Sequence, residues 1–96
     1  MAALDMLTTA PVYTSPEYRL AQSACADLYH YYGIPVWGAA GVSDAHCFDQ
    51  QAGMEMAVSL LMAALDGTNL VHGVGSFGQG LIGSPAAIVM LSLIHI

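Results

Sequence analysis

A few polar side chains in this sequence stand where a short apolar run gives way to a loop. His72 opens a glycine-rich loop at residues 73–83, which also contains Gln79. Asp44 lies in a second loop, which follows the apolar residues 34–40. In parallel α/β proteins, ligands bind and catalysis takes place at the carboxyl ends of the strands. We therefore predict His72 and Asp44 as catalytic residues and Gln79 as a substrate-binding residue, with a purely structural, hydrogen-bonded histidine as the alternative for His72.

The same loops contain side chains of the types that bind metal ions. Besides Asp44 and His72, the candidates are His46 and Asp49. Their spacing matches no established ligand pattern, and the two cysteines form no zinc-binding pattern with the histidines. We therefore predict no metal site, and a reduced thiol at each cysteine.

Three helices are predicted from their capping residues. Ser15 can cap a helix over Pro16–Tyr32, since proline suits the first helical position. Asp49 can cap a second helix that runs to Asp66, and the pair Ser84-Pro85 predicts a third. The side chains expected to face the core are Leu20, Ala21, Ala24, Cys25, Leu28 and Tyr32 in the first helix, and Ala52, Met56, Ala57, Leu60, Leu61 and Ala64 in the second.

Two buried strands are predicted at residues 34–40 and 69–74, because both runs lack polar alternation. Helices and strands alternate, and the strand starts lie about thirty-five residues apart, which is the cadence of a (β/α) barrel or a doubly wound sheet. A complete TIM (β/α)8 barrel needs eight such units in about 250 residues. We predict an α/β fold, a fragment of about two β/α units of a TIM barrel, whose strands pair in parallel through a right-handed crossover.

The composition indicates a chain that cannot cover its own apolar surface. Hydrophobic residues make up 56% of it and charged residues 8%, against roughly 25% charged in ordinary soluble domains. We therefore expect burial within a larger fold and a homo-oligomer for the full-length protein. Polar residues and glycines interrupt every apolar run, and the start of the chain has no basic residue before an apolar stretch, so we predict no membrane span, no signal peptide and a cytoplasmic protein.

The charge balance excludes one class of partner. Arg19 is the only cation, set against seven carboxylates. A nucleic-acid surface needs clustered lysine and arginine to replace the counterions of the phosphates. We therefore predict no nucleic-acid partner.

The last residues differ in character from the rest. Residues 91–96 read Leu-Ser-Leu-Ile-His-Ile, and they look like translated adapter sequence joined to the reading frame. We predict a partial barrel domain at residues 1–90 and an artefactual tail at 91–96, and we assign no function to His95.

Six short motifs, in order, resemble the trimethylamine methyltransferase family. The resemblance extends to about Met90 but covers only a fraction of the family's length, and the family's TIM barrel agrees with the cadence above. The motifs are Thr9-Ala10-Pro11, Ser15-Pro16-Glu17, Tyr32-Gly33-Ile34-Pro35, Ser43-Asp44-Ala45, Asp49-Gln50-Gln51-Ala52-Gly53, and Asn69 through Gly75.

The resemblance implies transfer of a methyl group from an amine to the Co(I) of a corrinoid protein. The corrinoid belongs to that partner, so no cofactor is expected on this chain itself. In family members acting on trimethylamine, a pyrrolysine lies just before the Ser-Asp-Ala motif, at the place that we assign to Gly41, two residues before Ser43. Gly41 and His72 therefore imply the non-pyrrolysine branch, which is similar to glycine betaine methyltransferases. The alternatives are a trimethylamine methyltransferase, or a truncated fragment with no activity of its own.

A quaternary ammonium is best held by aromatic faces and a negative potential, worth roughly 0.5–2 kcal/mol per cation–π contact. Trp37 and Phe77 supply candidate aromatic faces, and Asp44 supplies a candidate field. Together with Gly41 and Gln79, the two aromatic residues complete the predicted substrate-binding set. A place in the barrel core is the alternative for Trp37.

Overall fold

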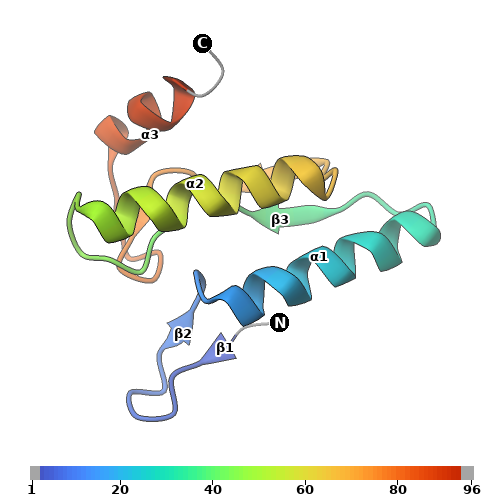
Figure 1. Cartoon of the computed structure of the whole chain (residues 1–96), viewed down its shortest axis with the longest axis horizontal. Coiled ribbons are helices and arrows are strands. Elements are labelled where there is room, and N and C mark those ends of the chain that lie inside the picture. The colour runs from blue at the N-terminus through green and yellow to red at the C-terminus, as the bar shows by residue number, and fades with distance from the viewer. Residues whose placement is uncertain (1–2, 94–96) are drawn as a thin grey trace.

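The computed structural model of the chain describes residues 3–93, in which helices alternate with short strands (Figure 1). This order confirms the predicted α/β class. The elements are β1 (Ala3–Leu4), β2 (Pro11–Val12), α1 (Pro16–Tyr31), β3 (Trp37–Ala39), α2 (Gln50–Leu65), β4 (Leu70–His72), β5 (Ser76–Phe77), β6 (Ile82–Gly83) and α3 (Pro85–Ser92).

The centre of the fold is a β-α-β unit. Strands β3 and β4 pair in parallel, with Trp37 opposite Leu70 and Ala39 opposite His72, and α2 connects them. The predicted parallel pairing is confirmed, whereas the handedness of the crossover stays a prediction. Both strands are shorter than predicted: the paired residues are Trp37–Ala39 and Leu70–His72, and hydrogen bonds from the Leu70 amide to the Val36 carbonyl and from the Ala40 amide to the His72 carbonyl lie at the two ends of the ladder.

The predicted helix boundaries are confirmed to within one residue. The Ser15 hydroxyl accepts a hydrogen bond from the Tyr18 amide at 3.3 Å, and the Asp49 carboxylate accepts one from the Ala52 amide at 2.9 Å. Each bond satisfies an amide that the first helical turn leaves free. Gly33 then takes a φ of +67°, the left-handed conformation that ends helices and that glycine adopts without strain.

The predicted core face of α1 is wrong for this part of the protein. Leu20 is 66% exposed, and Leu28 and Tyr32 are also exposed. The buried side chains of α1 are Arg19 and Ala26 instead. The apolar stripe in the sequence predicts a covered face, but within residues 3–93 this face is covered only in part, since Ala21 and Cys25 are half-buried.

The prediction for α2 is partly confirmed. Ala52 and Met56 are fully buried, but Ala57, Leu61 and Ala64 are exposed. The remaining buried positions of α2 are Ser59 and Ala63. The buried face is therefore rotated toward Ser59, whose hydroxyl accepts a hydrogen bond at 2.9 Å from the amide of Gly41 at the end of β3.

One apolar cluster joins α2, the loops and α3. It contains Ala45, Ala52, Met56, Phe77, Ala87 and Leu91. Leu91 is the first residue of the predicted tail, so the start of that tail belongs to α3 and the core. Residues 94–96, including His95, lie outside the described residues.

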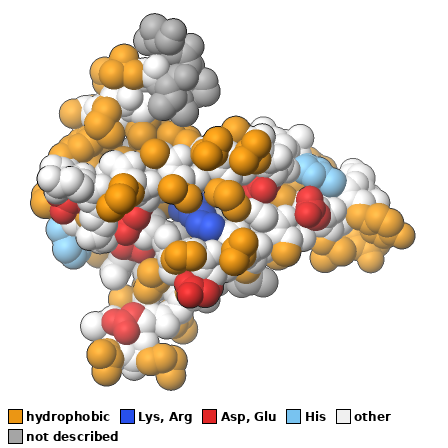
Figure 2. Space-filling view, in the orientation of Figure 1, with side chains coloured by type: hydrophobic (Ala, Val, Ile, Leu, Met, Phe, Trp, Pro, Cys, Tyr) orange, Lys and Arg blue, Asp and Glu red, His pale blue; other side chains and the backbone are white. Residues whose placement is uncertain are grey.

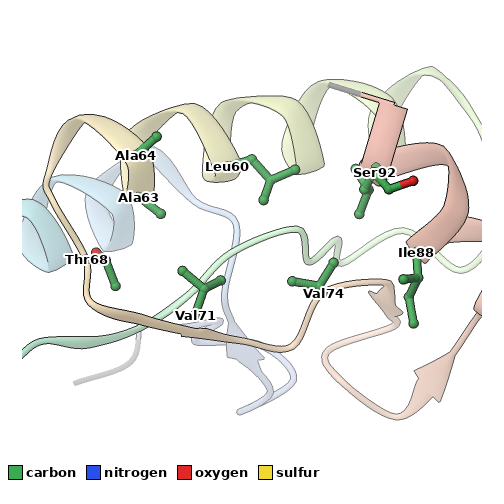
Figure 3. A pocket seen from close by; sticks show the side chains of 9 residues that line it. Leu60, Ala63, Ala64, Thr68, Val71, Val74, Ile88 and Ser92 are labelled. Atoms are coloured by element: carbon green, nitrogen blue, oxygen red, sulfur yellow. The ribbon is translucent and has the colours of Figure 1, made fainter. Parts of the chain in front are cut away.

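An apolar cavity of about 380 Å³ lies between α2, β4 and α3. Figure 3 shows Leu60, Val71, Val74 and Ile88 pointing into the same space from these elements. No titratable side chain lines it. This cavity is therefore a gap in the apolar packing and carries no groups for chemistry.

Apolar side chains also cover much of the outer surface of α1 and α2, where charges are few (Figure 2). The turn between β1 and β2 exposes Met6 and Leu7 almost completely, at 90% and 94%. Within residues 3–93, no helix has both the length and the apolar character that a bilayer crossing requires. The sequence prediction of an incompletely covered chain is therefore confirmed for the described residues.

Candidate functional site

A cavity of about 310 Å³ opens at the carboxyl ends of β3 and β4. It brings together three of the predicted site residues, Asp44, His72 and Gln79, from two separate loops. The full lining is Tyr13, Tyr18, Ala39, Val42, Ser43, Asp44, His72, Gly73, Ser76, Gln79 and Gly80. The sequence therefore predicted the location of the cavity, and the roles of its residues stay predictions.

Backbone hydrogen bonds hold the two loops of this cavity together. The Gly75 amide donates to the Gly41 carbonyl at 2.8 Å, and the Ser43 amide donates to the Ser76 carbonyl at 2.9 Å. A single bridge between Val42 and Ser76 continues the parallel pairing beyond the strands. The wall that carries Asp44 is thus fixed to the wall that carries Gln79.

His72 has a defined tautomer when its ring is neutral. Its Nδ1 lies 3.0 Å from the carbonyl oxygen of Gly38. Because a carbonyl oxygen only accepts hydrogen bonds, Nδ1 must carry the proton, and Nε2 is left with a free lone pair. The His72 ring also meets Trp37 edge to face, at 5.2 Å between centroids. His72 can therefore accept a hydrogen bond from a ligand while its other nitrogen is held by the sheet.

Asp44 is held by Thr14 from the segment before α1. Its Oδ2 accepts hydrogen bonds from the Thr14 amide at 3.1 Å and from the Thr14 hydroxyl at 2.7 Å. Its Oδ1 is enclosed by protein and has no hydrogen-bond partner within residues 3–93. The one cation of the chain, Arg19, donates to Ala39 and Gln22 rather than to a carboxylate. The negative charge of Asp44 is therefore fixed in place beside the cavity without a direct ion pair in this part of the chain.

Glu55, on α2, supports the same loop from below. Its Oε2 accepts hydrogen bonds from the Ser43 hydroxyl at 2.6 Å and from the Asp44 amide at 3.0 Å, and its Oε1 accepts one from Gln51 at 2.8 Å. Burial on its own raises the pKa of Glu55, but the hydrogen bonds from Ser43, Gln51 and the Asp44 backbone together bring the pKa below its ordinary value of 4.5. Glu55 is therefore ionised in the folded protein at neutral pH.

Arg19 completes a small group of charges under the cavity. Its side chain is 5% exposed, and its Nη1 donates to the Ala39 carbonyl at 2.6 Å. Burial lowers the pKa of Arg19 below its ordinary value. Charge interactions with Tyr18, Asp44 and Glu55 act in the opposite direction and offset only part of this effect. Two carboxylates thus lie near one guanidinium, which leaves a local charge of about −1 when all three are ionised.

The lowered pKa of Glu55 predicts a pH-dependent contribution to stability. A carboxyl group whose pKa is lower in the folded state stabilises that state above the unfolded pKa, and this stabilisation is lost as the pH falls through the folded pKa. We expect wild type to be more stable than Glu55→Gln at neutral pH, with the difference shrinking as the pH drops below 4.5. The difference in stability is measured from the melting temperatures of both proteins across this pH range. A difference that stays constant with pH would contradict the prediction.

Three predicted substrate-binding residues do not line this cavity. Phe77 is 3% exposed and packs in the core, edge to face with Phe48. Trp37 is 69% exposed in the described chain and lines a smaller neighbouring cavity of about 180 Å³, so its place in the barrel core of the complete protein stays an untested alternative. Gly41 is buried, and a Cβ there would meet Leu91 and Val74. Within the described chain, the Phe77 ring and the Cβ position of Gly41 face the apolar packing, and the predicted substrate-binding roles of Phe77, Trp37 and Gly41 stay predictions for the complete protein.

Other candidate ligands from the sequence are dispersed. His46 and Asp49 are both exposed and do not line the cavity, and Asp49 caps α2. Among residues 3–93, no three side chains of the metal-binding types gather closely enough to hold an ion. Cys25 and Cys47 are free thiols.

Sequence reasoning missed two aromatic residues of the cavity. Tyr13 and Tyr18 both line it, and their rings meet edge to face at 6.0 Å between centroids. They lie on either side of the Ser15 cap, so the turn into α1 brings them to the same side of the chain. The spacing around a helix start was the only available signal, and it does not show which cavity such a pair will face.

Comparisons with known proteins give the family. The sequence model described as Trimethylamine methyltransferase (MTTB) matches residues 1–92. The chain is 40% identical over 82 residues to trimethylamine methyltransferase MttB of Methanosarcina barkeri strain Fusaro, covering 85% of the chain and 16% of that relative. It is 37% identical over 82 residues to the MttB of Desulfitobacterium hafniense strain DCB-2, covering 85% of the chain and 16% of that relative.

A relative with a different name matches at a similar level. The glycine betaine methyltransferase of Desulfitobacterium hafniense strain Y51 is 39% identical over 70 residues, which are 73% of the chain and 15% of that protein. The chain therefore spans about a sixth of the length of the curated relatives that it matches. Because the family's sequence model covers nearly the whole chain, the chain belongs to the trimethylamine methyltransferase family.

Proposed function

We propose that the cavity at the ends of β3 and β4 holds the methylated ammonium group of a methyl donor. In the complete protein, one methyl group of this donor is transferred to the reduced cobalt of a corrinoid carried by a partner protein. The observation that carries the proposal is the Asp44 carboxylate, fixed beside the cavity without a direct ion pair in the described chain. Family membership supplies the reaction class.

The chemistry of the cavity suits a cation that cannot donate hydrogen bonds. A quaternary ammonium has no N–H, so it needs a negative potential and aromatic faces rather than an exposed acceptor. Asp44 supplies the potential even though its Oδ1 is enclosed, and Tyr13 and Tyr18 supply the rings. Two carboxylates near one guanidinium give the region a net negative charge, which favours the positively charged trimethylammonium end of a betaine.

The reaction is balanced without a proton transfer. The C–N bond to one methyl group breaks, its electron pair stays on nitrogen, and the donor leaves as a neutral tertiary amine. The methyl group forms its new bond with the electron pair of Co(I) on the partner. Within this chain, the lining residues bind and orient the donor, and the corrinoid remains on the partner protein.

The proposed donor is a quaternary ammonium of the glycine betaine type, with trimethylamine as the alternative. Identities of 40% and 39% to relatives with either name do not separate the two donors. Leaving-group chemistry favours the quaternary donor, because trimethylamine must first be activated before it can release a methyl group. Gly41 offers no side chain for such activation, although a side chain built there would meet Leu91 and Val74 rather than the cavity.

The proposal also places the β3–α2–β4 unit within a TIM barrel. Both strands have an unpaired edge in the described chain, and the connection through α2 is that of a β/α repeat. The cavity then lies at the carboxyl end of the barrel strands, where barrel enzymes carry their active sites. This placement supports the assignment of the cavity as the donor site.

The test uses the complete protein with its corrinoid partner. Glycine betaine, other betaines and trimethylamine are supplied in parallel, and methyl-cobalt formation is followed by absorption spectroscopy. We expect methyl transfer from a betaine and none from trimethylamine. Methyl transfer from trimethylamine alone would overturn the donor assignment.

A binding measurement separates recognition from chemistry. Glycine betaine is titrated into the complete protein beside its carbon isostere, in which a tert-butyl group replaces the trimethylammonium group. We expect the charged donor to bind at least about tenfold more tightly, since each tenfold corresponds to about 1.4 kcal/mol. Equal affinities would show that the cavity does not recognise the positive charge.

A further inference from the structure

The position of Asp44 depends on a residue that does not line the cavity. Glu55 lies on α2, in the groove between α1 and α2, and it is absent from the cavity lining. Its Oε2 accepts one hydrogen bond from the Asp44 amide and one from the hydroxyl of the preceding Ser43. A single carboxylate oxygen thus ties two consecutive residues of the loop to a helix.

The Ser43 hydroxyl extends this attachment. Ser43 is almost fully buried, and its Oγ also accepts a hydrogen bond from the Ala45 amide at 3.0 Å. Glu55, Ser43 and the backbone of residues 43–45 therefore form one connected hydrogen-bond network beneath the cavity. Thr14 fixes the carboxylate of Asp44, whereas Glu55 fixes its backbone.

Hydrogen bonds to an ionised carboxylate are the stronger kind, and the Ser43–Glu55 distance of 2.6 Å is short. The other attachments of the Asp44 loop are backbone bonds, the hydrogen bond from the Gly41 amide to Ser59, and the Thr14 contact, so Glu55 is the acceptor that ties Ser43 and the Asp44 backbone to α2. Loss of Glu55 would leave the buried Ser43 hydroxyl and the Asp44 amide without their acceptor. The loop would then move to recover those bonds.

We propose that Glu55 is a positioning residue, which holds the Asp44 carboxylate where it stabilises the cationic methyl donor. This inference rests on the proposed function of the cavity. Glu55 touches neither donor nor corrinoid, and it acts only through Ser43 and Asp44. Glu55 thus has a functional role although it lies on α2, outside the loops in which the sequence predicted the site.

The role predicts a specific kinetic pattern. The donor carries a full positive charge in the ground state, and this charge diminishes as the C–N bond breaks. A correctly placed Asp44 therefore favours donor binding and does not favour the transition state over the bound donor. Displacing Asp44 should weaken binding and leave the methyl-transfer rate at saturating donor unchanged or slightly higher, because part of the lost stabilisation is absent from the transition state.

The experiment compares variants of the complete protein. Glu55→Ala removes both hydrogen bonds to the loop, and Glu55→Gln retains one acceptor oxygen in a side chain of the same size. Gln51→Ala is the matched control, because Gln51 contacts the other oxygen of Glu55 and does not touch the loop. Dissociation constants for glycine betaine are measured without the partner, and single-turnover rates are measured with it.

We expect Glu55→Ala to raise the dissociation constant of glycine betaine about tenfold, the size of one lost hydrogen bond to a charged group. Glu55→Gln should give an intermediate increase, and Gln51→Ala should stay within about twofold of wild type. Affinity for the carbon isostere should not fall in any of them, because its tert-butyl end carries no charge for Asp44 to attract and its retained carboxylate gains nothing from Asp44. That last comparison separates a displaced charge from general unfolding.

The outcomes separate this inference from the proposed function. If wild type binds glycine betaine no better than its carbon isostere, the proposed function fails. If wild type binds glycine betaine more tightly than the carbon isostere, and folded Glu55→Gln shows the same difference in affinity, the positioning role is refuted. If Glu55→Ala lowers the saturated rate and loses affinity for both ligands alike, its role is structural and the inference also fails.

Discussion

Replacing Asp44 with asparagine is expected to weaken binding of a quaternary ammonium donor by about 10- to 100-fold, or roughly 1.4–2.8 kcal/mol. Asparagine has the same shape and keeps one oxygen for the two Thr14 hydrogen bonds, so the loop retains its attachment. What disappears is the negative charge beside the cavity. A charge pair a few ångströms apart near a protein surface is worth about 4 kcal/mol at an effective dielectric constant of about 20, which sets the upper limit.

The control for Asp44→Asn is Asp49→Asn. Asp49 caps α2, and asparagine is an equally good capping residue, so this variant removes a carboxylate from the same loop without loss of the cap. Isothermal titration calorimetry with glycine betaine measures the dissociation constant of each variant. Unchanged affinity in Asp44→Asn, or equal loss in both variants, would remove Asp44 from the donor site.

Replacing Gly75 with alanine is expected to produce the largest loss of stability, about 2–4 kcal/mol. Gly75 has a φ of +82°, where an L-residue is strained. A Cβ at this position would lie 2.7 Å from the Ile88 side chain and 3.1 Å from the Ser84 carbonyl oxygen. The backbone of Gly75 also donates to Gly41 across the cavity loops, so movement that relieves the clash disturbs both walls.

Gly53→Ala is the matched control for Gly75→Ala. Gly53 lies within α2, is exposed, and has open space where a Cβ would be. Alanine there should stabilise the helix by about 0.5–1 kcal/mol, because glycine is a poor helix former. Apparent melting temperatures should therefore fall for Gly75→Ala and rise slightly for Gly53→Ala. A melting temperature for Gly75→Ala at or above that of wild type would contradict the prediction.

The sequence by itself determined the three helices, the parallel strand pair and the end of that sheet at which the cavity lies, but not the short pairs β1–β2 and β5–β6. Ser15 and Asp49 cap their helices in the structure, because a side-chain acceptor before a helix satisfies a free amide wherever the helix later packs. His72 and Asp44 meet at one cavity, because parallel strands place their carboxyl ends on the same edge of a sheet. These features follow from local bonding and from strand direction, both of which can be read along the chain.

Only the tertiary structure decided which side chains face the cavity. Phe77 and Gly41 lie in the same loops as Asp44 and Gln79, yet their side-chain positions point into the core. Glu55 carries no sequence signal at all, because its link to the Asp44 amide joins residues 11 positions apart in different elements. Side-chain direction in an irregular loop is set by the local φ and ψ angles and by whatever packs against it. Hydrophobic periodicity and residue spacing report neither the φ and ψ angles of a loop nor its packing neighbours. The contact between Glu55 and the Asp44 loop is therefore seen only in the folded structure, where the loops and α2 lie together.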